Sequence, residues 1–264
     1  MLHDPSFRDR VVSEPDAALA GLDLDGVERA MLARVDARAW RLDPHRPWRV
    51  LTALIAELPV TVALVGAPQR LDRFFASERF HRAIRAREAL AIAFADWLGE
   101  VATRPAERAL LALEGAFVAV RRARAPSVAA SPPESPPERL VTSPRVRALS
   151  LPAGTLGAWE STRARLGPNP VEALVEGFAP RTPRLGPALE HVLIERPLDR
   201  EEPVAGFVQA ELVELLRAAA SPVARADLVA RIVASEATAD EAAEILDGLE
   251  NEGLLAPAPE PERA

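Results

Sequence analysis

The stretch "TADEAAEILDGLENEGLL", residues 238–255, decides how the second half of this sequence is interpreted. It predicts a helix that ends in a glycine turn and is followed by a short apolar segment. One apolar stripe runs along this helix at helical spacing, formed by Ala242, Ile245, Leu246 and Leu249. The segment therefore predicts a packed terminal helix.

The elements before this helix predict a small α+β domain over residues 139–257. "VRALSLP" (146–152) and "HVLIERP" (191–197) alternate as strands do, and Pro197 stops the second one. Two short helices are expected between the strands, and two more before residue 238. Strands followed by three helices are the order of a winged-helix-like domain. The expected helices are "TLGAWESTRARLG", "PVEALVEGF", "AGFVQAELVELLRAAA" and "PVARADLVARIVAS".

The charge of this domain argues against a nucleic-acid partner, although most winged helices bind DNA. From residue 201 to the end there are fourteen acidic residues and four Arg, a net charge of 4 − 14 = −10. The final stretch, residues 238–255, has six acids and no base. Because affinity for nucleic acid comes largely from cations at phosphates, the terminal helix should be repelled by a duplex.

Residues 1–124 predict a separate all-helical domain. Its runs of apolar residues at helical spacing are separated by short connections, and Pro59 and Pro105 suit the first turns of helices. Asp23 or Asp25 can cap the run "GVERAMLARVDARAW", and Ser77 can divide "PQRLDRFFASERFHRAI". Residues 125–138, "APSVAASPPESPPE", predict a proline-rich linker, and residues 258–264 a disordered tail. The fold class expected is therefore mainly α with a small β component.

The composition removes most routes to catalysis in this chain itself. The 264 residues include no Cys, and all 32 basic residues are Arg, so thiolate, Cys-ligated metal and lysine chemistry are excluded. The four His are scattered without ligand spacing, the sequence has no phosphate-binding glycine loop, and no hydrolase motif surrounds Ser150, Ser161 or Ser221. A binding role is favoured over an enzyme, with no catalytic residues and no metal site expected. The N-terminal residues do not resemble a signal peptide, and no apolar run approaches the length that spans a bilayer. A cytoplasmic protein without membrane partners is therefore expected.

Two side-chain groups have a functional and a structural interpretation. The aromatic side chains of "RFFASERFH", Phe74, Phe75 and Phe80, could stack on bases, but core packing is favoured. Glu107 and Glu114 share one helix face, and exposure to solvent or a buried pairing with Arg is favoured over acid–base catalysis.

The first half resembles a known family. "LIAELPVTVALVG", "RLDRFFASERFHRAI", "ALAIAFADWLG" and "ALLALEGAFVAVRRA", within residues 40–123, are similar to the helical domain of partner proteins of multinuclear non-haem iron-dependent oxidative enzymes (MNIOs). More weakly, the second half resembles the recognition element of pathways that modify ribosomally made peptides (RiPPs). In that element a leader peptide pairs with a strand edge beside the last helix.

The resemblance implies a non-catalytic accessory subunit that binds an MNIO and recruits a precursor peptide to it. Iron is then expected in the partner enzyme and no cofactor in this chain. The alternative is a transcriptional regulator with a winged helix and a helical sensing domain. Peptide contacts are expected from His191, Val192, Leu193, Ile194, Glu195, Glu241 and Glu244, with residues 191–195 as an exposed edge strand. Contacts with the oxidase, as a heterodimer, are expected from Arg79, Phe80, His81 and Trp159.

Overall fold

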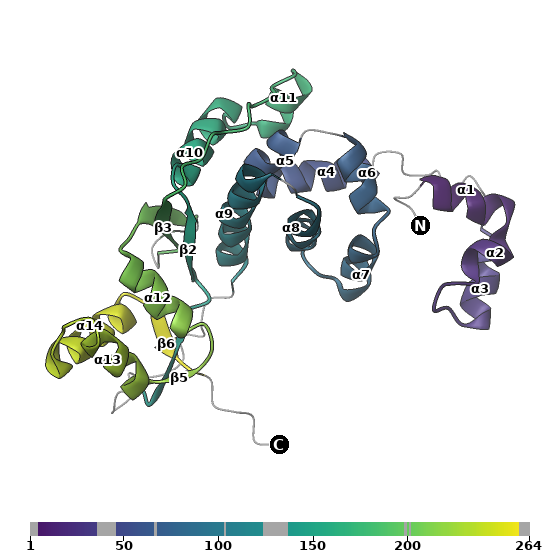
Figure 1. The fold of residues 1–264 in the computed structure, drawn as a ribbon. Coiled ribbons are helices and arrows are strands. Elements are labelled where there is room, and N and C mark those ends of the chain that lie inside the picture. Colours follow the sequence, from purple (N-terminus) through teal and green to yellow (C-terminus); the bar gives the residue numbers. More distant parts are fainter. Residues whose placement is uncertain are drawn as a thin grey trace. The chain divides into compact units, whose positions relative to one another are not determined.

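The computed structural model describes residues 5–35, 46–65, 68–102, 104–123, 137–197, 200 and 202–258. The described chain is mainly helical, with two small antiparallel sheets (Figure 1). This agrees with the fold class expected from the sequence. Most of the expected linker, residues 125–136, and the tail from residue 259 lie outside the described residues.

Residue contacts divide the chain into two compact units. The first comprises residues 1–111 and 162–182, and the second comprises residues 112–161 and 183–264. The division falls inside two helices, α9 (Pro105–Arg122) and α10 (Thr155–Leu166). Residues 112–122, which the sequence places with the helical domain, thus group with the sheets.

The first unit is helical and contains an aromatic core. Phe74 lies at its centre, with the ring centroids of Phe80, Phe94 and Trp97 at 5.2, 5.0 and 5.5 Å. Core packing of the phenylalanines is therefore confirmed. The helices are α1 (Pro5–Ser13), α2 (Pro15–Leu19), α3 (Gly26–Ala33), α4 (Arg46–Glu57), α5 (Pro59–Val65), α6 (Pro68–Phe75), α7 (Glu78–Ala86), α8 (Leu90–Val101), the start of α9, the end of α10, and α11 (Pro170–Val175).

Local signals in the sequence set several of these helix starts. Asp25 accepts hydrogen bonds from the backbone N–H groups of Val27 and Glu28, which completes a capping box at α3. Ser77 caps α7 by accepting from the N–H of Phe80 at 3.2 Å. Among the described residues, no single helix has the length and apolar composition needed to cross a membrane; α4 and α5 meet that criterion together, as a pair bent by 118°.

The second unit contains both sheets. One sheet has the strand order β2-β3-β4, with β2 at Val146–Pro152, β3 at Leu189–Glu195 and β4 at Val204–Phe207. On one of its faces Leu151, Val192 and Ile194 pack against Leu113 and Phe117 of α9. On the other, Val146 and Leu193 pack with the core of helices α12 (Ala210–Ala218), α13 (Arg225–Val233) and α14 (Ala239–Asn251).

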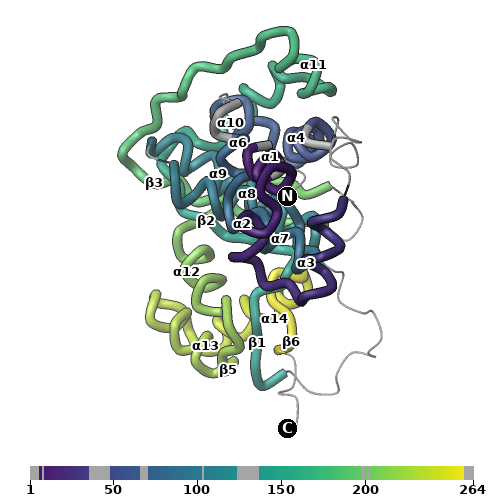
Figure 2. The backbone as a smooth tube through the Cα atoms, turned by 90° about the vertical axis from the view of Figure 1, so that its right-hand side faces the viewer, coloured from purple at the N-terminus to yellow at the C-terminus, as the bar shows by residue number. Residues whose placement is uncertain are grey.

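The other sheet has the order β5-β1-β6 and closes the helical part of this unit. Its strands are β1 (Arg139–Thr142), β5 (Val223–Ala224) and β6 (Leu255–Pro257), and β6 runs antiparallel beside β1 (Figure 2). Ala242, Leu246 and Leu249 of α14 are buried as predicted, whereas Ile245 is 45% exposed. The apolar exit after α14 supplies Leu254 and Leu255 to the same core.

Candidate functional site

The strand expected to bind a peptide at its edge, β3, is the middle strand of its sheet. Leu193 pairs with Ala148 of β2 and Gly206 of β4, and Ile194 pairs with Arg147 and Ala205. The prediction that residues 191–195 form an exposed edge is therefore wrong. The physical reason is the four-residue strand β4, whose last three residues fall within the helix expected from residue 205.

The side chains of β3 divide between the two faces of the sheet. Val192 and Ile194 are fully buried, and Leu193 is partly buried against the opposite core. His191 and Glu195 are partly exposed. Of the five expected peptide residues on this strand, the two buried ones are core positions.

The free edges of this sheet belong to β2 and β4. The N–H of Val208 bonds to the carbonyl of His191, and the N–H of Arg196 bonds to that of Arg145. Hydrogen-bonded pairs alternate along an antiparallel ladder. The backbone groups of Ala148 and Ser150 in β2, and of Ala205 and Phe207 in β4, therefore point away from β3. No bond from a described residue reaches them.

A polar cluster lies on the same face of the sheet as α12. Ser150 Oγ is 3.1 Å from Nδ1 of His191, across the β2–β3 ladder, and Arg217 of α12 donates to the same oxygen at 3.3 Å. No carboxylate of a described residue contacts the His191 imidazole. The arrangement can bind a polar or anionic group, and it lacks the third member of a Ser–His–Asp triad.

A hollow of about 350 Å³ lies between β2 and the end of α12. Its apolar wall includes Val146, Ala148 and Leu216, and its cations are Arg147 and Arg217. Both arginines are exposed, and neither forms an ion pair with a described residue. This combination of open backbone, apolar wall and cations without an ion-pair partner among the described residues makes the outer edge of β2 a candidate binding surface.

The expected peptide residues of the last helix, Glu241 and Glu244, lie elsewhere on this unit. Glu241 belongs to the capping box of α14 and accepts from the backbone N–H of Thr238 at 2.8 Å. Hydrogen bonds from the Thr238 backbone and hydroxyl lower the pKa of Glu241 below its usual value. Glu244 is exposed, and the hollow that it lines with Glu241 includes no residue of β3. The structure thus does not bring these acids together with residues 191–195.

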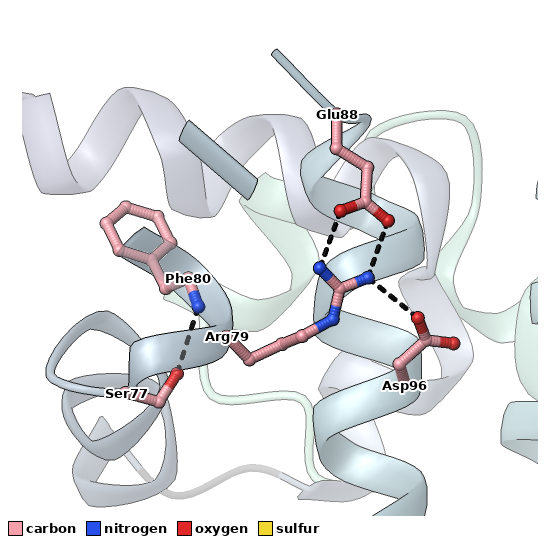
Figure 3. Close-up of polar contacts among 5 residues, drawn as sticks. All are labelled: Ser77, Arg79, Phe80, Glu88 and Asp96. Atoms are coloured by element: carbon pink, nitrogen blue, oxygen red, sulfur yellow. Dashed lines mark hydrogen bonds and ion pairs between the residues drawn. The ribbon is translucent and has the colours of Figure 1, made fainter. Parts of the chain in front are cut away.

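In the first unit, Arg79 is held by two carboxylates (Figure 3). Its Nη1 and Nη2 atoms bond to the two oxygens of Glu88, each at 2.5 Å, and Nη2 also bonds to Asp96 at 2.8 Å. Hydrogen bonds to Glu88 and then to Asp96 raise the pKa of Arg79, and the Arg79 hydrogen bond lowers the pKa of Glu88. Arg79 therefore ties α7 to α8 and to the turn between them.

The other three residues expected to contact the oxidase, Phe80, His81 and Trp159, differ in burial and in the unit to which they belong. Phe80 is fully buried in the aromatic core, so its side chain offers no contact surface. His81 is partly exposed, with its ring 5.5 Å from that of Phe80. Trp159 lies in the second unit, where it donates to the buried Glu114 at 3.0 Å and stacks on Phe117 at 4.6 Å. His81 and Arg79 are thus the partly exposed members on α7.

Glu107 and Glu114 are buried carboxylates with identified partners. Glu107 is 3.6 Å from Arg104, and Glu114 accepts from Trp159. Over the described ranges, no group of three or more His, Asp or Glu side chains could hold a metal ion.

Sequence reasoning predicted β2 as a strand but missed β4, the position of the free edges and the placement of Arg217 beside Ser150. The segment "VAGF" of β4 is too short to show an alternating pattern, but Pro203 before it and Gly206 within it are signals against a helix starting at residue 205. Arg217 stands out only because the other charges around it are acidic, such as Glu211 and Glu214. Comparisons of this sequence with protein-family models and with curated proteins find no match.

Proposed function

We propose that this protein is a non-catalytic accessory subunit that binds an MNIO-type iron oxidase and recruits a ribosomal precursor peptide to it. The observation that carries the proposal is the pair of free edges on the sheet β2-β3-β4. An extended peptide can add to such an edge as a further strand, because the main chain of the edge supplies unused donors and acceptors. Open edges are otherwise a liability that proteins cover, so their retention here supports a binding role.

The helical unit is proposed to hold the oxidase. The resemblance of residues 40–123 to MNIO partner proteins supports this assignment, and the exposed part of α7 near Arg79 and His81 supplies a surface. Arg79 acts by fixing α7 against α8 and Asp96, so its contribution is to the shape of that surface. Iron and the oxidative chemistry belong to the partner enzyme in this proposal.

The second unit is proposed to hold the peptide as a winged-helix-like module. The run α12-β5-α13-α14-β6 supports this description, since three helices, with a two-residue strand after the first of them, are followed by a closing strand. The acids of α14 support a peptide over a duplex. Its exposed side includes Asp240, Glu241, Glu244 and Asp247, which would face phosphates if the helix entered a groove.

The same element order favours one alternative, a transcriptional regulator with a helical sensing unit. The two proposals require different charges on the last helix of the module, because a regulator needs cations on the helix that enters the major groove. The helix α14 has none. The peptide-recruiting function is therefore preferred.

The proposal is tested by co-expressing this chain with an MNIO and a short precursor peptide, both encoded in the same genome as this chain. We expect the chain and the oxidase to elute from gel filtration as one complex, and the oxidase to modify the peptide poorly without this chain. Separate elution, together with full oxidase activity in the absence of the chain, would contradict it.

A further inference from the structure

The outer edge of β2 has two residues whose backbone is open to a ligand. At the start of the strand, the N–H of Val146 bonds to the carbonyl of Ser143, and the carbonyl of Val146 accepts from Arg147 Nη1 at 2.7 Å. Val146 is therefore closed to a partner strand. Ala148 and Ser150 are open, and each presents one N–H and one C=O outward.

The lining of the hollow beside this edge indicates which side chains of a bound peptide it could accommodate. Pro144, Val146, Leu216 and Ala220 make its lining mostly apolar, while Arg147 and Arg217 place two cations on it. Arg217 Nη2 donates to the hydroxyl of Ser150 in β2, so its guanidinium lies on the α12 face of the sheet beside one of the two open residues. A carboxylate next to a guanidinium forms the strongest class of side-chain hydrogen bond.

We infer that the edge of β2 beside α12 binds an extended peptide segment that carries one carboxylate side chain between apolar ones. The main chain of the segment pairs with Ala148 and Ser150, an apolar side chain enters the hollow, and the carboxylate pairs with Arg217. The inference rests on the proposed peptide-recruiting function, and it specifies the ligand chemistry and the edge used.

The acidic surroundings restrict the ligand further. With fourteen acids against four Arg after residue 200, this part of the chain repels a strongly acidic peptide. Charges beyond about 8 Å are largely screened at physiological ionic strength, so a single well-placed carboxylate responds mainly to the nearby arginines. An isolated Glu or Asp in an apolar segment fits both conditions, and a run of acids does not.

The edge used is tested by amide hydrogen exchange on the full chain. The probe is a blocked peptide of about nine residues, alternating Val and Thr around a central Glu, a length that matches one strand. We expect the amides of Ala148 and Ser150 to exchange at least about tenfold more slowly with the peptide bound. The amides of Ala205 and Phe207, on the opposite edge, should be unchanged. Protection at β4 instead of β2 overturns the inference.

The charge requirement is tested by two matched reversals. Arg217→Glu and Arg231→Glu both reverse an exposed arginine in the last turn of a helix of the same module, but only Arg217 lines the hollow. We expect Arg217→Glu to weaken binding of the Glu peptide about tenfold and Arg231→Glu by less than about twofold. A peptide with a central Lys should bind Arg217→Glu more tightly than it binds the parent.

The outcomes separate this inference from the function on which it rests. Equal weakening by both reversals, or failure of the parent to bind the Glu peptide, overturns the inference. Neither result affects complex formation with the oxidase and its own precursor, which is scored separately by gel filtration and modification. Loss of that complex contradicts the proposed function whatever the probe peptide does.

Discussion

Arg79 and Glu88 form a two-pronged ion pair in which two guanidinium nitrogens each lie 2.5 Å from a different carboxylate oxygen. The side chains are 18% and 32% exposed, so the pair is partly shielded from water. Glu88 follows α7 and precedes α8, and Asp96 of α8 bonds to the same guanidinium. This contact therefore fixes the geometry of the α7–α8 turn.

The pair makes the stability of the protein depend on acid pH. The pKa of Glu88 is lowered in the folded state, so its contribution is present above the unfolded pKa, near 4.5, and is lost as pH falls through the lower folded value. We expect Glu88→Gln to cost about 1 kcal/mol at pH 7 and to cost little at pH 3. Thermal melts at both pH values measure this.

Glu100→Gln is the matched control for that measurement, because Glu100 is exposed on α8 and forms no ion pair with a described residue. Its effect should be small at both pH values. An equal loss of stability from Glu88→Gln at pH 3 and pH 7 would contradict the ion-pair account.

Proline scanning distinguishes the middle strand from the edges. The N–H of Leu193 faces β4 and that of Ile194 faces β2, so proline at either position breaks a ladder hydrogen bond. We expect each variant to lose about 1–3 kcal/mol or more, since a ladder hydrogen bond is lost and the proline ring disturbs a strand that is paired on both sides. Phe207→Pro should be no less stable than Phe207→Ala, because the N–H of Phe207 faces outward. A normal melting temperature for Leu193→Pro or Ile194→Pro would show that β3 is not paired on both sides.

The contact between Trp159 and Glu114 predicts a measurable coupling. Trp159 donates to a carboxylate that is 1% exposed and stacks on Phe117. Trp159→Phe keeps an aromatic ring but removes the donor, and we expect a cost of about 1–3 kcal/mol. In a double-mutant cycle with Glu114→Leu, which removes the acceptor, the two effects should not add. Additive losses would mean that the hydrogen bond contributes nothing to stability.

No sequence-specific binding to duplex DNA is expected. The exposed acids of α14, including Asp240 and Glu244, would oppose the phosphates of any groove that the helix entered. Gel-shift assays at low salt with a pool of random duplexes provide the measurement. Selective enrichment with submicromolar affinity would support the regulator alternative.

The sequence predicted most of this fold because its helices and two longer strands carry strong local signals. The capping residues Asp25 and Ser77 and the strand 146–152 appear where the pattern placed them. Four strands of two to four residues were missed, since so short a run contains no measurable alternation. Domain boundaries at 1–124, 125–138 and 139–257 remain predictions of folding units, and the contacts group residues 112–122 with the sheets.

The candidate site was less predictable, because an edge is a property of the whole sheet. Residues 191–195 form a strand as expected, yet whether that strand is an edge depends on the pairing partner at Val204–Phe207. The contact of Ser150 with His191 joins residues 41 positions apart, and that of Arg217 with Ser150 joins residues 67 apart. Spacing along the chain contains no information about such cross-strand and helix–sheet contacts.

Complex formation with an MNIO tests the central claim most directly. The parent chain, the oxidase and the precursor peptide are co-expressed, separated by gel filtration and assayed for modified peptide by mass spectrometry. We predict one complex that contains this chain and the oxidase, and modification that drops at least about tenfold when this chain is omitted. Separate elution of the two proteins, with undiminished modification by the oxidase alone, would contradict the account.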